Sequence, residues 1–436
     1  MTTEAQLTSR TFPSSTILLF ALFSIVPAWA LGINTLWFHF IALFAFATVQ
    51  NAHRSIAFAK TFPLVLVLYI FWYALSILIN SPHNEIVRTT AAFYNWSFWL
   101  MGLLTHVAAS SIEWRVWSKK LEQPLNIVSI CLGIASIWTL FAWYGMHIEI
   151  AKIPSLLGSL FDSSKLPLLL AQNFSMDIFA PDYINARAVP RLSALAPYPT
   201  ATAALAIFLA PFVILRKPSG YAGTIVWTLA VFGIAASLYL TFSRTIIVSA
   251  FVAVLIIGLV YKRVFLTIAL LSVLPAAWLL ASSVDIFKTM LNSRGGSTQL
   301  RLDLYYFQTS QMLNDAPLFG LGVKDRLSQF VIPLGSHSTL LGALYKTGIV
   351  GFLLVCAFVV SANTLWVRAL RIAQDRQETL FAAKLGFSVL TISLWMFTED
   401  IDAPPLICFL FFLFTGTLAS MLEAHRNLTT AQNPEL

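Results

Sequence analysis

Long apolar stretches separated by short polar segments constrain this chain more than any other feature. Each runs for roughly 15–23 residues, enough for a tilted helix to cross about 30 Å of hydrocarbon. The sequence predicts twelve such helices, at residues 16–35, 36–50, 62–79, 91–109, 125–146, 200–215, 222–241, 245–261, 264–282, 339–361, 380–398 and 404–422. We therefore expect an all-α polytopic membrane protein that forms one integral membrane domain over residues 1–436.

The composition supports the same fold class. Of the 436 residues, 58% are hydrophobic and only 11% are charged, whereas soluble domains carry about 25% charged residues. Cys131, Cys356 and Cys408 lie in apolar stretches, so we interpret them as small packing residues and not as disulfides or metal ligands. The net charge is +8, but no run of basic residues is longer than three, and we expect no nucleic acid partner.

The distribution of Lys and Arg predicts the orientation in the membrane. With the N-terminus in the cytoplasm, 15 of the 27 basic residues fall inside, and the short outer loops hold only Arg88 and Arg244. Cytoplasmic loops carry such an excess of basic residues. The first apolar stretch resembles a signal peptide, with Arg10 before it and Ala28-Trp29-Ala30 near its end. We expect it to be retained as a helix.

Two long outer segments, residues 147–199 and 283–338, have room for a site. In the first, residues 153–170 are apolar and interrupted by proline, which predicts a segment that lies along the interface or re-enters the membrane. In the second, residues 300–313 carry apolar side chains at helical spacing, which predicts an amphipathic helix.

One His and three Arg residues share the predicted outer face. His337 ends the second long segment where an apolar helix starts, and Arg191, Arg244 and Arg301 lie in or beside the outer loops. The planar guanidinium of Arg forms bidentate bonds to phosphate, and a neutral His can act as a general base. Together these residues predict a site that binds an anionic substrate and transfers a proton.

Structural explanations exist for each of these residues. An Arg at a membrane edge often reaches lipid phosphate. Asp182 is a candidate ion-pair partner for Arg191, and Asp303 is one for Arg301. A His at a helix start often caps or packs the helix. Two glycines within residues 348–351 can form a small-residue packing face.

A cluster of carboxylates, Glu399, Asp400 and Asp402, lies between the last two predicted helices. Its Asp-x-Asp spacing can hold Mg²⁺ or Mn²⁺, as in metal-dependent sugar transferases. We favour the alternative, a solvated acidic turn, and predict no metal site. The sequence also lacks a Walker loop, a dinucleotide fingerprint and a Gly-x-Ser-x-Gly elbow, so we expect no cofactor.

Several motifs resemble those of one family. His337-Ser338, nine residues, then Gly348-Ile349-Val350-Gly351 resembles the signature His-(Asn/Ser/Gln)-x9-Gly-x-x-Gly of the bacterial O-antigen ligases. Arg301 with the stretch at 315–322 resembles their Arg…Asp-x-Pro-x-x-Gly-x-Gly. Weaker similarities surround Arg191 and Arg244. The superfamily also contains O-antigen polymerases and O-linked oligosaccharyltransferases.

The resemblance implies a multi-pass enzyme of the bacterial inner membrane, with a GT-C-like fold similar to other lipid-linked sugar transferases and a periplasmic site. The implied reaction is an inverting, metal-independent glycosyl transfer. Its donor is O-antigen on undecaprenyl pyrophosphate, and its acceptor is a sugar hydroxyl of lipid A–core; membrane lipids surround both. The implied roles are base for His337 and pyrophosphate ligands for Arg191, Arg301 and Arg244, with Ser338, Gly348 and Gly351 as supporting motif residues. Ser338 stands where many relatives have Asn.

Two rival hypotheses remain open at this point. A polymerase that extends repeat units on the same carrier lipid would share these motifs. A transporter or lipid flippase predicts discontinuous helices and ionisable residues near the midplane, whereas the predicted helices here hold few charges. The sequence does not select which Arg residues contact phosphate among Arg187, Arg191, Arg244, Arg294 and Arg301.

Overall fold

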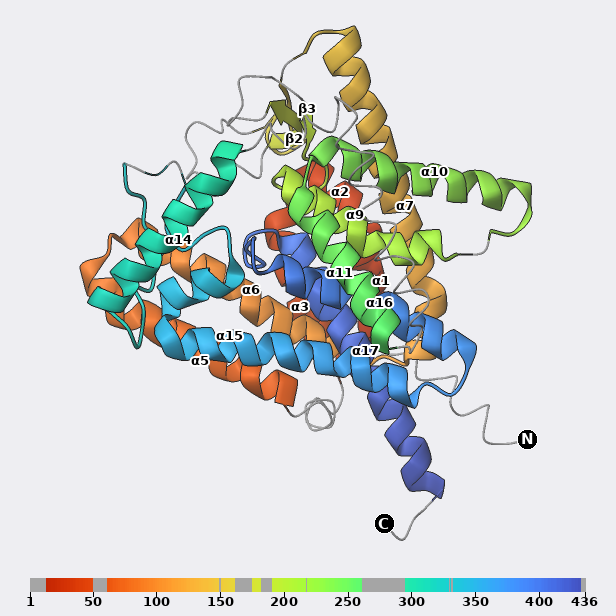
Figure 1. Ribbon diagram of the computed structural model, residues 1–436. Coiled ribbons are helices and arrows are strands. Elements are labelled where there is room, and N and C mark those ends of the chain that lie inside the picture. Colours follow the sequence, from red (N-terminus) through yellow and green to blue (C-terminus); the bar gives the residue numbers. More distant parts are fainter. Residues whose placement is uncertain are drawn as a thin grey trace.

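The computed structural model describes residues 13–49, 61–148, 150–160, 175–181, 190–216, 218–260, 295–328, 330 and 332–432. Helices dominate this part of the chain (Figure 1). They are α1 (Pro13–Phe23), α2 (Ile25–Leu31), α3 (Asn34–Ala47), α5 (Thr61–Asn80), α6 (Ile86–Ser110), α7 (Trp114–Leu140), α9 (Pro199–Ile214), α10 (Gly220–Thr241), α11 (Arg244–Val260), α14 (Gly295–Asp315), α15 (Thr339–Ile372), α16 (Arg376–Trp395) and α17 (Pro405–Gln432). Two single turns, η1 (Ser81–His83) and η2 (Phe141–Gly145), follow α5 and α7.

The helical fold class is confirmed, but twelve membrane spans are not. Eleven of the twelve apolar stretches coincide with helices, and the twelfth, 264–282, lies outside the described residues. Among the described residues, five helices are long and apolar enough to cross a membrane, and six if α1 and α2, bent by 58°, count as one span. α3, α9 and α11 are apolar but shorter. The chain is therefore a mostly helical protein with several helices suited to a membrane.

The helix α17 forms the centre of the bundle. Of the residues in its most apolar 18-residue stretch, 94% are buried, and residues 409–414 are fully buried. α6, α15 and α16 pack around it, while α5 lies along α15 (Figure 1). A helix that is apolar on every side is stable only when it is surrounded. This packing brings the loop before α17 against the start of α15.

A small antiparallel sheet, absent from the all-α prediction, occupies part of the first long segment. Its strands are β1 (Ala151–Pro154), β2 (Ser175–Pro181) and β3 (Pro190–Leu192), in the order β1-β2-β3. Phe179 of β2 lies opposite Leu192 of β3. Of the segment 153–170 that was predicted to lie along the interface or to re-enter the membrane, residues 153–154 end β1 and residues 156–160 form turns. Its residues 161–170 lie outside the described residues. Strands this short pair with distant residues and leave little periodic pattern.

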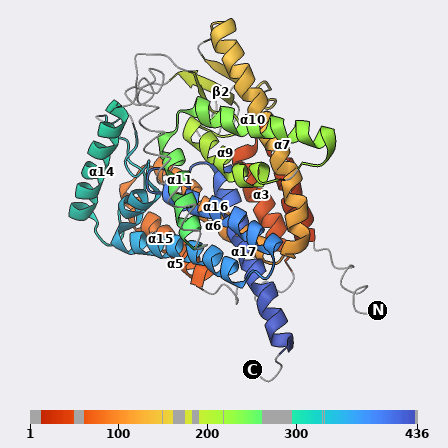
Figure 2. The ribbon, with the colours of Figure 1, turned by 45° about the vertical axis from the view of Figure 1, so that its right-hand side comes forward.

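The second long segment contains the amphipathic helix expected at residues 300–313. α14 spans Gly295–Asp315 and stands at the side of the bundle (Figure 2). Leu304 and Met312 are buried against Tyr345 of α15, whereas Leu302 and Tyr306 are exposed. Residues 283–294 lie outside the described residues. The buried face of α14 holds the chain that leads into α15.

Candidate functional site

The helix α15 is broken at Gly348. This residue has φ +68° and ψ −168°, a conformation that is essentially confined to glycine. A Cβ atom at Gly348 would overlap the carbonyl oxygen of Leu318, and one at Gly351 would overlap the side chain of Thr347. Gly348 therefore has a conformational role in addition to the small-residue packing that the sequence offered as an alternative. The break separates a short first segment, residues 339–347, from the rest of α15.

The Asp-x-Pro-x-x-Gly-x-Gly stretch after α14 seals this break. The amides of Leu321 and Gly322 donate to the carbonyls of Tyr345 and Lys346, at 2.9 Å each. Those carbonyls lie in the last helical turn before Gly348, where intrahelical partners are missing. The two sequence motifs are therefore one structural unit, because each satisfies the backbone of the other.

Side chains of α5 hold the same unit from the other side. The Ser76 hydroxyl lies 2.6 Å from the carbonyl of Phe319 and 2.7 Å from that of Lys346. The indole of Trp72 donates to the carbonyl of Thr347 at 2.9 Å and stacks on Phe319, with ring centroids 4.7 Å apart. The first segment of α15 thus has a fixed position relative to α5.

His337 immediately precedes α15, but its neighbour makes the helix cap. The Ser338 hydroxyl accepts a hydrogen bond from the amide of Leu341 at 3.1 Å. Ser and Asn are both favoured N-caps, so Ser338 can fill this role as an Asn would. His337 has φ +62°, a value uncommon outside glycine. Tyr305 donates to the His337 carbonyl at 2.5 Å, and burial raises the pKa of Tyr305 to about 12, which keeps it a donor.

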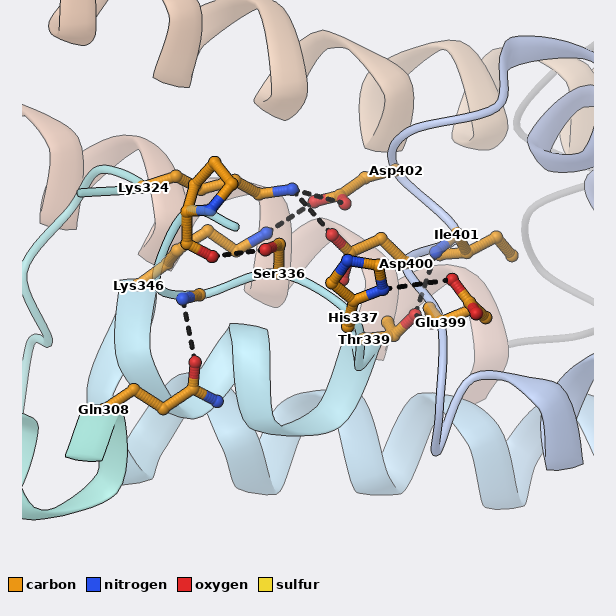
Figure 3. Close-up of polar contacts among 12 residues, drawn as sticks. Gln308, Lys324, Ser336, His337, Thr339, Lys346, Glu399, Asp400, Ile401 and Asp402 are labelled. Carbon is orange, nitrogen blue, oxygen red and sulfur yellow. Dashed lines mark hydrogen bonds and ion pairs between the residues drawn. The ribbon is translucent and has the colours of Figure 1, made fainter. Parts of the chain in front are cut away.

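One buried carboxylate contacts both His337 and Arg301. Glu399 Oε1 accepts a hydrogen bond from Arg301 at 2.8 Å. Glu399 Oε2 lies 3.5 Å from His337 Nδ1 (Figure 3). The proposed pairing of Arg301 with Asp303 is wrong, since Asp303 accepts instead from Gln299 on its own helix. Two of the residues selected from the sequence are therefore brought together by Glu399, which the sequence analysis had assigned to a solvated acidic turn.

The interpretation of residues 399–402 as a solvated acidic turn is wrong. Glu399, Asp400 and Asp402 are 3%, 5% and 1% exposed. Lys324 Nζ lies 2.7 Å from Asp400 Oδ2, and Lys346 Nζ lies 2.6 Å from Asp402 Oδ2 (Figure 3). Burial of a charge is costly unless it is paired. Cations from segments distant in the sequence supply those pairs, which is why the local pattern gave no sign of burial.

The Asp-x-Asp pair is occupied by lysine ammonium groups. Within the described residues, no group of three or more His, Cys, Asp and Glu side chains is arranged to hold a metal ion. Asp402 also accepts a long hydrogen bond, 3.4 Å, from the indole of Trp99. These carboxylates therefore fit ammonium and indole donors, and their arrangement gives no coordination set for Mg²⁺ or Mn²⁺.

One face of α14 fixes the chain around His337. Arg301, Tyr305 and Gln308 are spaced at i, i+4 and i+7, so they project from the same side of the helix. Gln308 is fully buried, and its carbonyl accepts from the amide of Gly335 at 2.9 Å. The positions of Tyr305 and Gln308 follow from their helical spacing to Arg301, a signal that is present in the sequence.

Arg191 and Arg244 lie at a second location, the turn between α10 and α11. Arg191 is buried in β3, and its Nε and one terminal nitrogen both donate to the carbonyl of Thr241 at 3.2 Å. Thr241 ends α10, and Arg244 begins α11. Asp182, the other proposed partner of Arg191, lies outside the described residues, as do the alternatives Arg187 and Arg294.

Tyr198 connects the Arg191 segment with the acidic loop. Burial raises the pKa of Tyr198 well above its usual value, and the negative charges of Glu399 and Asp400 raise it further. Tyr198 comes seven residues after Arg191 and directly before α9. The chain that follows the strand of Arg191 therefore passes close enough to Glu399 for the charge of this carboxylate to act on Tyr198.

Acid is expected to destabilise the protein through the buried carboxylates. Burial alone would raise the pKa of Glu399, but the contact with His337 and the charge of Arg301 hold it below its ordinary value; Lys346 does the same for Asp402. A depressed pKa contributes stability above the unfolded-state pKa, about 4.3 for Glu, and this contribution is lost as pH falls through the folded-state pKa. The melting temperature in detergent should fall between pH 5 and pH 3, and less steeply for Glu399→Gln. If the melting temperatures of the parent and Glu399→Gln fell equally steeply with pH, Glu399 would not be a source of this acid sensitivity.

Comparison with known proteins gives a family match over part of the chain. No curated protein matches the chain. A family model described as O-antigen ligase matches residues 229–356, from α10 to the first half of α15. The matched region contains Arg244, Arg301 and His337, whereas Arg191 and Glu399 lie outside it. This region, which holds the break in α15 and the residues that its two motifs join, is therefore similar to the O-antigen ligase family.

Proposed function

We propose that the protein transfers O-antigen from undecaprenyl pyrophosphate to a sugar hydroxyl of lipid A–core, at the periplasmic face of the bacterial inner membrane. The observation that carries this proposal is the shared contact of His337 and Arg301 with Glu399. One carboxylate holds a candidate base beside a candidate anion ligand, which is what sugar transfer from a pyrophosphate requires. The family match to an O-antigen ligase model supports the same reaction class.

In the proposed reaction, His337 accepts the proton of the acceptor hydroxyl. Glu399 faces Nδ1, so Nε2 is the nitrogen free to take that proton, and the carboxylate stabilises the imidazolium that forms. The hydroxyl oxygen attacks the anomeric carbon while the bond from that carbon to the pyrophosphate oxygen breaks. The electron pair leaves with the lipid pyrophosphate, and the anomeric configuration inverts. The 3.5 Å separation between His337 and Glu399 is of the kind that tightens when substrate binds.

Arg191, Arg244 and Arg301 are the proposed ligands of the donor pyrophosphate. Each charge-assisted bond from a guanidinium to phosphate contributes roughly 1.5–3 kcal/mol. Arg301 uses two of its donors on Glu399 and the carbonyl of Thr398, so the remaining N–H groups would face the substrate. Because donor and acceptor are anchored in one bilayer, less entropy is lost when they meet.

A reconstituted assay tests the proposal directly. The purified protein in liposomes is given a lipid-linked donor and lipid A–core, and the products are separated by gel electrophoresis. O-antigen attached to lipid A–core is the expected product. Longer chains that remain on the carrier lipid would instead identify a polymerase. The absence of any sugar transfer from wild-type protein would reject both.

Glu399→Gln is expected to lower kcat by as much as about 10²-fold, because the imidazole loses its orienting charge and a small misplacement of the base is costly. The KM for donor should change less than kcat. Asp303→Asn is the matched control: it removes a carboxylate of α14 that bonds only Gln299 among the described contacts. Equal activities of the two variants would show that Glu399 has no part in catalysis.

A further inference from the structure

A second buried ion pair lies beyond the contacts that hold His337. Lys346 Nζ is 2.6 Å from Asp402 Oδ2, and each side chain is 2% exposed. We infer that this pair positions His337 against Glu399, an inference that rests on the proposed function. Neither residue contacts His337 or Arg301 in the described set of hydrogen bonds and ion pairs, so the effect would act through the backbone.

The pair joins the two pieces of chain that carry the candidate base and its carboxylate. Lys346 lies near the end of the first segment of α15, and Asp402 is three residues after Glu399. Thr339 lies at the other end of that segment. Its backbone amide donates to the carbonyl of Glu399 at 3.0 Å, and its hydroxyl accepts from the amide of Ile401 at 2.9 Å. The acidic loop is therefore tied to both ends of the segment that His337 precedes (Figure 3).

Because α15 is broken at Gly348, the contacts of the acidic loop with residues 339–347 help to position this segment. The first segment is not held in line by a continuous α-helix, because Gly348 interrupts the helical conformation directly after residue 347. The surroundings of Lys346 are aromatic: its ammonium lies 5.3 Å from the ring centroid of Tyr73. A buried ion pair in such surroundings adds little stability over apolar side chains of similar size. Its best-attested use is to fix position, which here means the distance between His337 and Glu399.

The test removes both charges together, since loss of Asp402 alone would leave Lys346 buried and unpaired. Loss of Lys346 alone would leave Asp402 with only Lys324, 3.9 Å away. The double variant Lys346→Met with Asp402→Asn is expected to insert and to melt near the parent temperature. Its kcat should fall at least about tenfold, with the KM for donor within about twofold, because a displaced base affects the reaction step more than binding. Lys346→Arg keeps the charge and should retain more of kcat than Lys346→Met. Unchanged kcat in the double variant would overturn the inference.

The control is an ion pair that another buried lysine makes with a half-buried glutamate. Lys384 Nζ lies 2.8 Å from Glu122 Oε1, between α16 and α7. The double variant Lys384→Met with Glu122→Gln should keep the parent kcat; an equal loss in both double variants would indicate general loosening and overturn the inference.

A second readout does not depend on catalysis. Diethyl pyrocarbonate modifies accessible imidazoles, and the side chain of His337 is 28% exposed. Mass spectrometry should show faster modification of His337 in the Lys346 and Asp402 double variant than in the parent or the control. An unchanged rate would overturn the inference even if the wild-type protein transferred no sugar, whereas a raised rate in a protein without transferase activity would reject only the proposed function.

Discussion

His337→Ala is expected to lower kcat for glycosyl transfer by roughly 10²- to 10⁴-fold, the usual contribution of a general base. The variant should insert and melt like the parent, because the helix cap belongs to Ser338 and the Tyr305 hydroxyl bonds to the backbone of residue 337. Initial rates in the reconstituted assay, at saturating donor and acceptor, measure the effect. In cells, the same variant should leave lipid A–core without O-antigen.

The matched control is His83→Ala. His83 lies in η1, is exposed and is separate from the contacts of Glu399. It should keep the parent rate. His337→Gln adds a further check, because Gln retains hydrogen bonding but cannot accept the proton; it should be as inactive as the Ala variant. Full transfer by either His337 variant would show that another group, or water alone, takes the proton.

The sequence located much of the candidate site because its residues belong to local motifs. His337 sits at a fixed spacing before two glycines, and Arg301 sits before a proline- and glycine-rich turn. The structure brings both residues to one carboxylate. The apolar spacing at residues 300–313 also predicted the helix α14, near whose start Arg301 lies. Local spacing is sufficient for such features, since the periodicity of a helix determines which residues share a face.

The carboxylate itself could not be located in the same way. Three acidic residues in a loop form a solvated turn or a buried cluster depending on whether cations reach them, and Lys324 and Lys346 do so from more than 50 residues away in the sequence. Contacts at such separations leave no periodic signal. The cost of burying a charge explains the outcome only once the partners are known.

The number of spans and the small sheet were also beyond the sequence pattern. An apolar stretch gives a helix whether the helix crosses the membrane or packs inside the bundle, and α3, α9 and α11 are too short to meet the length expected of a span. The strands of the sheet are three to seven residues long and pair with one another across loops. Helix formation was therefore predictable here, whereas the placement of each helix relative to a bilayer was not.

Gly348→Ala is expected to cost the protein its folded state or a large part of its stability. The backbone of Gly348 lies in a region that costs other residues about 1–3 kcal/mol, and the added Cβ would overlap the carbonyl of Leu318. Moving that stretch away would also break the bonds from Leu321 and Gly322 to the end of the first segment, at roughly 0.5–1.5 kcal/mol each. The melting temperature in detergent and the yield of monodisperse protein measure the loss.

Gly223→Ala is the control for a glycine in a regular helix. Its nearest neighbour for an added Cβ is 3.7 Å away, and its φ lies in the ordinary range. Replacement by Ala there should stabilise α10 slightly, by about 0.5–1 kcal/mol. A melting temperature of Gly348→Ala equal to that of the parent would show that the break in α15 does not exist as described. Any Gly348→Ala protein that does fold should have little transferase activity. A straightened α15 would carry His337 away from Glu399.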